Sequence, residues 1–116
     1  MQTTDQTQHI GVNVVHGKLD ASTYTELEAE HEKHFASGGL YFVVDLREAT
    51  FIDSTGLSTL VKIYKQIQAI NGKLLIVRPN NPSAMNILSI TRFDQVFFMI
   101  DSLDAALRYV NDIRKA

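Results

Sequence analysis

The sequence of 116 residues predicts an α/β fold in which strands and helices alternate along the chain. Two runs, "LYFVVDL" at residues 40–46 and "KLLIV" at residues 73–77, are apolar at almost every position, which is typical of strands covered on both faces of a parallel sheet. Around these runs, apolar residues recur at helical spacing. Residues typical of turns and helix starts separate the segments, so the order strand–helix is predicted four times, with parallel pairing through right-handed crossovers.

The first strand and helix are predicted before residue 40. Apolar and other residues alternate over residues 10–14, so we expect a half-buried strand that ends near Gly17. The residues that offer an oxygen to cap the next helix are Asp20, Ser22 and Thr23. Thr23 and Glu26 have the spacing of a capping box. Residues at helical intervals then predict a helix of about 15 residues, which "SGG" at 37–39 ends; they are Tyr24, Leu27, His31 and Phe35.

Three more helices and one more strand are predicted after residue 50. One apolar stripe follows Ser54 and ends at Asn71-Gly72; it comprises Leu57, Leu60, Val61, Tyr64 and Ile67. Asn81-Pro82 is a helix-start pattern, and Ala84, Ile87 and Leu88 are expected to face the core. "VFFMI" at 96–100 is the fourth predicted strand, and Asp101 or Ser102 caps the last helix.

Composition limits the class of protein. The net charge of −2 and the pI of about 6.0 give no general attraction to nucleic acid or anionic membrane. No apolar run approaches the roughly 20 residues that span a bilayer. There are no cysteines, which excludes disulfides and thiolate metal sites. We expect a cytoplasmic protein with one domain over residues 10–116, preceded by a polar segment, residues 1–9, that is frayed or forms a short edge strand.

Patterns for catalysis, metal binding and cofactor binding are weak. Ser54 lacks the Gly-x-Ser-x-Gly pattern of a hydrolase, and the sequence places no histidine to serve as its base. The glycines do not form a phosphate-binding loop. "HEKH" at 31–34 is one residue short of a zinc motif, and His31 continues an apolar stripe, so it is interpreted as a partly buried structural residue. We therefore expect no enzyme activity, no metal and no cofactor.

The cluster Asp53-Ser54-Thr55-Gly56 interrupts apolar sequence and precedes a predicted helix. A strand that ends near Leu46 would place this loop at the carboxyl edge of the sheet, where α/β domains present functional residues. Asp53 or Ser54 could act only as the N-cap of the helix. Alternatively, Ser54 could carry a phosphate, which the free N–H groups and dipole of a helix N-terminus favour. Asp53 would repel that phosphate, and partner binding would change without refolding.

The order and spacing of several motifs resemble the STAS domain, and within it the anti-sigma factor antagonists of bacteria. The motifs are "GKLDAS" at 17–22, "VVDLREATFIDSTGL" at 43–57, "GKLLIV" at 72–77, "NP" at 81–82 and "FDQVF" at 93–97. The resemblance covers residues 10–113. It implies a four- to five-stranded, mixed but mainly parallel sheet with helices packed on it, and a binding protein rather than an enzyme.

The resemblance also implies partners and site residues. Members bind an anti-sigma factor that is itself a serine kinase, and a serine phosphatase removes the phosphate that the kinase adds. Carried onto this chain, the phosphoacceptor is Ser54, with Thr55 as the second choice. Asp53 and Gly56 shape the loop, Asp20 lies in the neighbouring loop that touches the partner, and Thr55 belongs to the same surface.

Two alternatives stay open at this point. STAS domains also serve as constitutive subunits of lipid transporters, stressosomes or other partner-switching complexes, and Ser54 would then be only a helix cap. A small enzyme or nucleotide-binding protein acting through Ser54 ranks third. The family also usually begins with an extra strand, for which only residues 1–9 are available.

Overall fold

The structure is a computed structural model, and it describes residues 10–115 of the protein. In chain order the elements are β1 (Ile10–Val14), β2 (Gly17–Leu19), α1 (Tyr24–Ala36), β3 (Tyr41–Asp45), β4 (Ala49–Ile52), α2 (Ser54–Ala69), β5 (Lys73–Val77), α3 (Pro82–Ile90), the 3₁₀ helix η2 (Phe93–Gln95), β6 (Phe98–Ile100) and α4 (Leu103–Lys115). The predicted edge strand in residues 1–9 lies outside the described residues.

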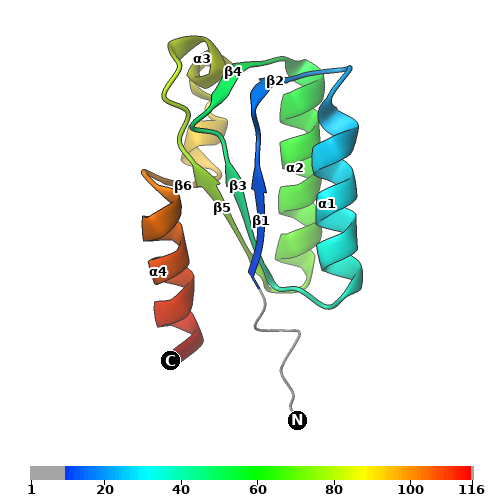
Figure 1. The fold of residues 1–116 in the computed structure, drawn as a ribbon, viewed down its shortest axis with the longest axis vertical. Helices are drawn as coiled ribbons and strands as arrows, with labels where there is room; N and C mark the ends of the chain where they lie inside the picture. The colour runs from blue at the N-terminus through cyan, green and yellow to red at the C-terminus, as the bar shows by residue number, and fades with distance from the viewer. Residues whose placement is uncertain (1–9, 116) are drawn as a thin grey trace.

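A four-stranded parallel sheet in the order β1-β3-β5-β6 forms the centre of the fold. Helices α1 and α2 cover one face of this sheet, and α4 covers the other (Figure 1). Alternate residues of β3 divide between the two faces: Phe42 and Val44 pack in the core under α1 and α2, and Val43 packs against α4. The predicted α/β class is confirmed. The pairings among residues 10–115 are all parallel, whereas the resemblance implied a mixed sheet.

A second, two-stranded parallel sheet of β2 and β4 was not predicted. The single strand expected up to Gly17 is two strands, and Gly17, with φ of +75°, begins the second one. Residues 49–52, expected to be loop, form β4. These strands have three and four residues and show no alternation of exposed and buried positions that periodicity could reveal.

The last predicted strand is shorter than expected. Residues 93–95 form a 3₁₀ turn, and the N–H of Phe97 donates to the carbonyl of Phe93 at 2.9 Å. Phe97 is buried against Tyr64 rather than paired with β5. Only Phe98–Ile100 pairs with β5, and β6 is therefore a three-residue edge strand.

The predicted helix caps are confirmed in part. Asn81 accepts from the N–H of Ser83 at 2.8 Å, and Ser102, rather than Asp101, accepts from the N–H of Ala105 at 3.0 Å. The capping box at Thr23 is wrong. Thr23 precedes α1, but its hydroxyl donates to the carbonyl of Lys18 at 2.8 Å and makes no cap hydrogen bond to the helix.

His31 is a buried polar residue between α1 and α2. Only 1% of its surface is exposed, and its Nε2 lies 3.0 Å from Oε1 of Gln66. Its Nδ1 has no hydrogen-bond partner in residues 10–115. Burial lowers the pKa of His31, because a charged imidazolium loses hydration there. Among the described residues no group of three or more His, Cys, Asp or Glu could hold a metal ion, and no helix is long and apolar enough to cross a membrane.

The pH dependence of stability tests the buried state of His31. Its folded pKa lies below the ordinary value of 6.5, so the unfolded chain binds the proton more readily. The free energy of unfolding should therefore be fully retained above pH 6.5 and fall as the pH drops below 6.5 toward the lowered folded pKa. Urea denaturation across this range would measure the slope.

The variant His31→Gln should remove most of that slope, and His16→Gln should retain it, because the His16 side chain is 70% exposed. An unchanged slope in His31→Gln would show that another group carries the pH dependence.

Candidate functional site

The segment Asp53–Gly56, predicted to be a loop after β3, instead follows β4 directly: Asp53 is the N-cap, and residues 54–56 are in the first turn of α2. Pairing of β2 with β4 places Leu19 opposite Ile52, so that the segment after each strand emerges at the same end of the two-stranded sheet. Residues 20–23 and residues 53–56 therefore lie side by side near the start of α2 (Figure 1). The structure thus places the loop of Asp20 beside residues 53–56, the neighbouring position that the resemblance implied.

Asp53 connects the loop of Asp20 to the first turn of α2. One carboxylate oxygen, Oδ1, accepts from the N–H of Gly56 at 2.9 Å and caps α2, and Oδ2 accepts from the N–H of Ala21 at 3.3 Å. The N–H of Asp53 donates to the carbonyl of Leu19 at 3.2 Å. Both oxygens of this carboxylate are thus engaged in holding the surface together.

Gly56 is buried, and it lies against the end of β2. A Cβ atom at this position would be 2.3 Å from the carbonyl oxygen of Leu19, far inside van der Waals contact. The residue has no positive φ, so the need for glycine arises from this close approach within the chain. The prediction that Gly56 shapes the loop has a physical basis here.

Ser54 is the first residue of α2, and it is exposed. Within the described part of the chain its hydroxyl has no hydrogen-bond partner, and Asp53 supplies the helix cap. The interpretation of Ser54 as the N-cap is therefore wrong. Thr55 is half-buried, and its carbonyl accepts from the hydroxyl of Thr59 at 2.9 Å. Of the two candidate phosphoacceptors, Ser54 is the more accessible.

Asp20 organises its own loop. Its Oδ1 accepts from the N–H of Ser22 at 3.0 Å, from the Ser22 hydroxyl at 2.8 Å and from the Thr23 hydroxyl at 3.2 Å. The hydrogen bonds from Ser22 hold the pKa of the Asp20 carboxyl below its ordinary value. The residue remains partly exposed, so a negative charge lies next to the start of α2 at neutral pH.

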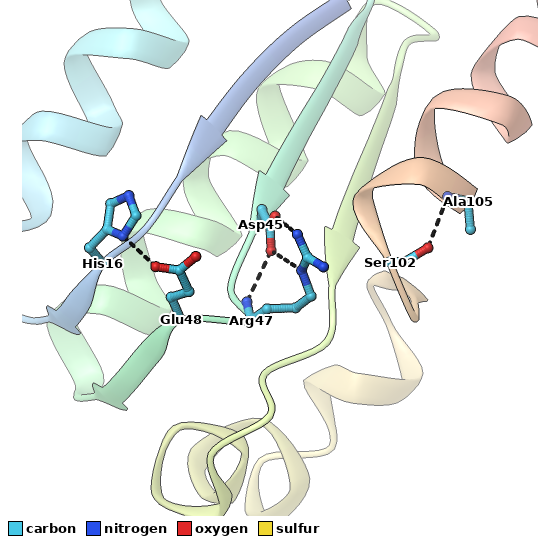
Figure 2. A network of polar contacts seen from close by, with 6 residues as sticks. All are labelled: His16, Asp45, Arg47, Glu48, Ser102 and Ala105. Carbon is cyan, nitrogen blue, oxygen red and sulfur yellow. Dashed lines mark hydrogen bonds and ion pairs between the residues drawn. The ribbon is translucent and has the colours of Figure 1, made fainter.

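A polar network lies at the turn between β3 and β4, and it was not predicted from the sequence. Figure 2 shows the carboxylate of Asp45 facing Arg47; it accepts from the N–H of Arg47 at 3.0 Å and from its guanidinium at 3.1 and 3.3 Å. Asp45 is 1% exposed, so these bonds offset the cost of burying its charge. Next to them, Nδ1 of His16 lies 2.7 Å from Oε1 of Glu48. A charged residue inside the apolar run 40–46 was the signal that could have revealed the network.

The fold and the site together define a small α/β domain that exposes a serine at the start of a helix. The family model for the STAS domain matches residues 2–106, and the chain belongs to this family. BtrV of Bordetella bronchiseptica, provisionally named an anti-sigma factor antagonist, is 25% identical over 104 residues, which are 90% of this chain and 89% of that protein. An anti-sigma-B factor antagonist of Listeria monocytogenes is 30% identical over 70 residues, 60% of each chain.

Solved structures show the same fold. An anti-sigma factor antagonist from Mycobacterium paratuberculosis has a TM-score of 0.77 and 26% identity, and the match covers 95% of this chain and 90% of that one. The antagonist SpoIIAA in its unphosphorylated form has a TM-score of 0.70 and 15% identity, with 99% and 96% covered. At that lower identity the likeness concerns the fold alone.

The first prediction from this geometry concerns which residue caps α2. Asp53→Ala should lower the free energy of unfolding by about 1–2 kcal/mol, because it removes the bonds to Gly56 and Ala21. Ser54→Ala should change it by less than about 0.5 kcal/mol. Urea denaturation measures both, and Asn81→Ala at the start of α3 is the matched control for loss of a cap. Equal losses for the first two variants would contradict the assignment of the cap.

The second prediction concerns the contact of Gly56 with β2. Gly56→Ala should cost at least about 1–3 kcal/mol, because the new methyl group would overlap the Leu19 carbonyl and α2 would have to move from β2. Thermal and urea denaturation measure the loss. Ser58→Ala, an exposed position on the same helix, is the control and should be close to neutral. A stable Gly56→Ala protein would show that α2 can shift away from β2 at little cost.

Proposed function

We propose that this protein is an anti-sigma factor antagonist that works as a binding switch controlled by phosphorylation of Ser54. The observation that carries the proposal is the position of Ser54: it is exposed at the first residue of α2, with the helix already capped by Asp53. Membership of the STAS family and the antagonists among its relatives support the same role.

In the unmodified state the protein binds an anti-sigma factor and thereby frees a sigma factor for RNA polymerase. The contact surface consists of the loop that holds Asp20, the first turn of α2 with Ser54, and the exposed side of α2. These parts are adjacent because Asp53 bonds to Ala21 in the loop and to Gly56 in the helix. Such a preorganised surface avoids the entropy cost of ordering loops on binding. This role places the protein in the cytoplasm, where the polymerase works.

The anti-sigma factor is also the kinase in this proposal. It transfers a phosphoryl group from ATP to Oγ of Ser54, ADP leaves, and a base of the kinase takes the hydroxyl proton. A serine phosphatase hydrolyses the ester and restores the hydroxyl. The protein itself is the substrate of both reactions and contributes no catalytic group.

The phosphate changes the surface rather than the fold. It adds about −1.5 to −2 charges at the N-terminus of α2, where free N–H groups and the helix dipole tolerate an anion. The neighbouring carboxylate of Asp53 is held by Gly56 and Ala21, and like-charge repulsion between it and the phosphate keeps the phosphate pointing to solvent. A partner that fits the neutral hydroxyl then meets two adjacent negative groups and dissociates.

The phosphorylation itself is the first prediction of this role. Intact-mass analysis of the protein from its native cells should show a phosphorylated fraction, and fragmentation should locate the phosphate on Ser54. Ser54→Ala should abolish the modification, whereas Ser83→Ala, near the start of α3, should leave it. An unmodified protein under every growth condition would favour the constitutive interaction subunit.

The effect on binding is the second prediction. The partner captured with Ser54→Ala and identified by mass spectrometry should bind Ser54→Asp at least about tenfold more weakly in calorimetry, because the added charge is repelled at the interface. Ser83→Asp is the matched control, since Ser83 is also exposed near the start of a capped helix. It should bind like the unmodified protein. Equal affinity of the partner for Ser54→Asp and Ser54→Ala would contradict the proposed switch.

A further inference from the structure

A shallow apolar groove runs along the exposed side of α2. Its floor is formed by Leu57 and Val61 of the helix and by Phe93 of η2. Lys62 and Lys65 border it. Phe93 is stacked on Phe97, which is buried, with the ring centres 5.4 Å apart. This part of the groove floor therefore packs directly on the core.

Ser54 belongs to the same helical stripe as this groove. At about 100° per residue, Ser54, Ser58, Val61 and Lys65 point within roughly 60° of one another. Ser58, which lines the groove, follows Ser54 by one turn, a rise of about 6 Å. That separation is shorter than the Debye length of about 8 Å at physiological salt, so a charge on Ser54 acts on the near end of the groove.

The charged residues that line the groove are Lys62 and Lys65. Residues 54–93 contain no Asp or Glu, and Asp53 and Asp94 flank this range. Lys62 is paired with Glu28 of α1 at 2.8 Å. Lys65 has no carboxylate within ion-pair distance in the described part of the chain. The groove thus combines an apolar floor with an available positive charge.

We propose that this groove binds an acidic segment of the partner, whose apolar side chains contact Leu57, Val61 and Phe93 and whose carboxylates pair with Lys65. The inference rests on the proposed function, because the occupant is the same partner that Ser54 controls. It explains how a phosphate on Ser54 weakens partner binding, because a new anion at one end of the stripe repels an acidic segment lying along it.

Charge and chemistry favour this occupant over others. A second copy in an isologous dimer would place the same cationic grooves against each other, which is unfavourable. Nucleic acid and anionic membranes call for a dense positive patch, whereas here one lysine is already paired and the floor is apolar. An acidic protein segment with apolar anchors fits both features.

The test uses a synthetic helical peptide with leucine on one face and glutamate on the other, and a counterpart with lysine in place of glutamate. Fluorescence anisotropy should show the glutamate peptide binding about tenfold or more tightly than the lysine peptide. Lys65→Glu should weaken the glutamate peptide by about tenfold, and Val61→Asp should abolish its binding. Lys115→Glu, on the helix that covers the opposite face of the sheet, should have no effect.

The results that would contradict peptide binding in the groove differ from those that would contradict the phosphorylation switch at Ser54. The proposed binding site would be contradicted by equal binding of both peptides. It would also be contradicted if Lys65→Glu and Val61→Asp had no effect in variants that circular dichroism shows to be folded. A dimer in light scattering that Val61→Asp dissociates, or vesicle binding by anionic lipid that Lys65→Glu abolishes, would replace the occupant with a second copy or a membrane.

The captured partner separates the two proposals. If Ser54→Asp loses this partner and the groove variants retain it, the switch stands without the groove. If the groove variants lose the partner and Ser54→Asp retains it, the groove stands without the switch.

Discussion

The carbonyl oxygen of Leu19 is the contact point on which the candidate site depends. It accepts the N–H of Asp53 at 3.2 Å, and it occupies the space that a Cβ at residue 56 would need. These contacts draw the first turn of α2 against the end of β2 and bring residues 20–23 beside residues 53–56. Because the inner side of the turn is filled by this approach, Ser54 is left on the outer side.

The longer elements could be predicted because each shows its own periodicity. The buried strands β3 and β5 lie in nearly continuous apolar runs, and the apolar stripe of α2 spans about three turns. The sheet of β2 and β4 could not be predicted in the same way. It pairs residues far apart in sequence, such as Gly17 with Ala49, and its strands have three and four residues. The two strands that position the site, β2 and β4, were therefore the hardest elements to predict from the sequence.

The sequence indicated the neighbourhood of the site but not the role of each oxygen. Asp53 and Ser54 were equally good cap candidates, and only the geometry shows that the carboxylate reaches Gly56 and Ala21. Thr23 illustrates the same limit, because its hydroxyl bonds to Lys18 instead of its helix. Such choices depend on where the backbone of a neighbouring strand lies, and neighbouring strands here come from distant parts of the chain.

In the proposed switch, the phosphate would lie next to a carboxylate that joins a loop to the start of a helix. Asp53 bonds to Gly56 at the start of α2 and to Ala21 in the loop of Asp20. In the proposed mechanism the phosphate on Ser54 therefore adds its charge where the Asp20 loop, the N-terminus of α2 and the near end of the groove meet. A partner that contacts any two of these parts must approach the phosphate. One modification can then weaken binding across the whole interface. The core, which includes Leu57 and Leu60, stays unchanged.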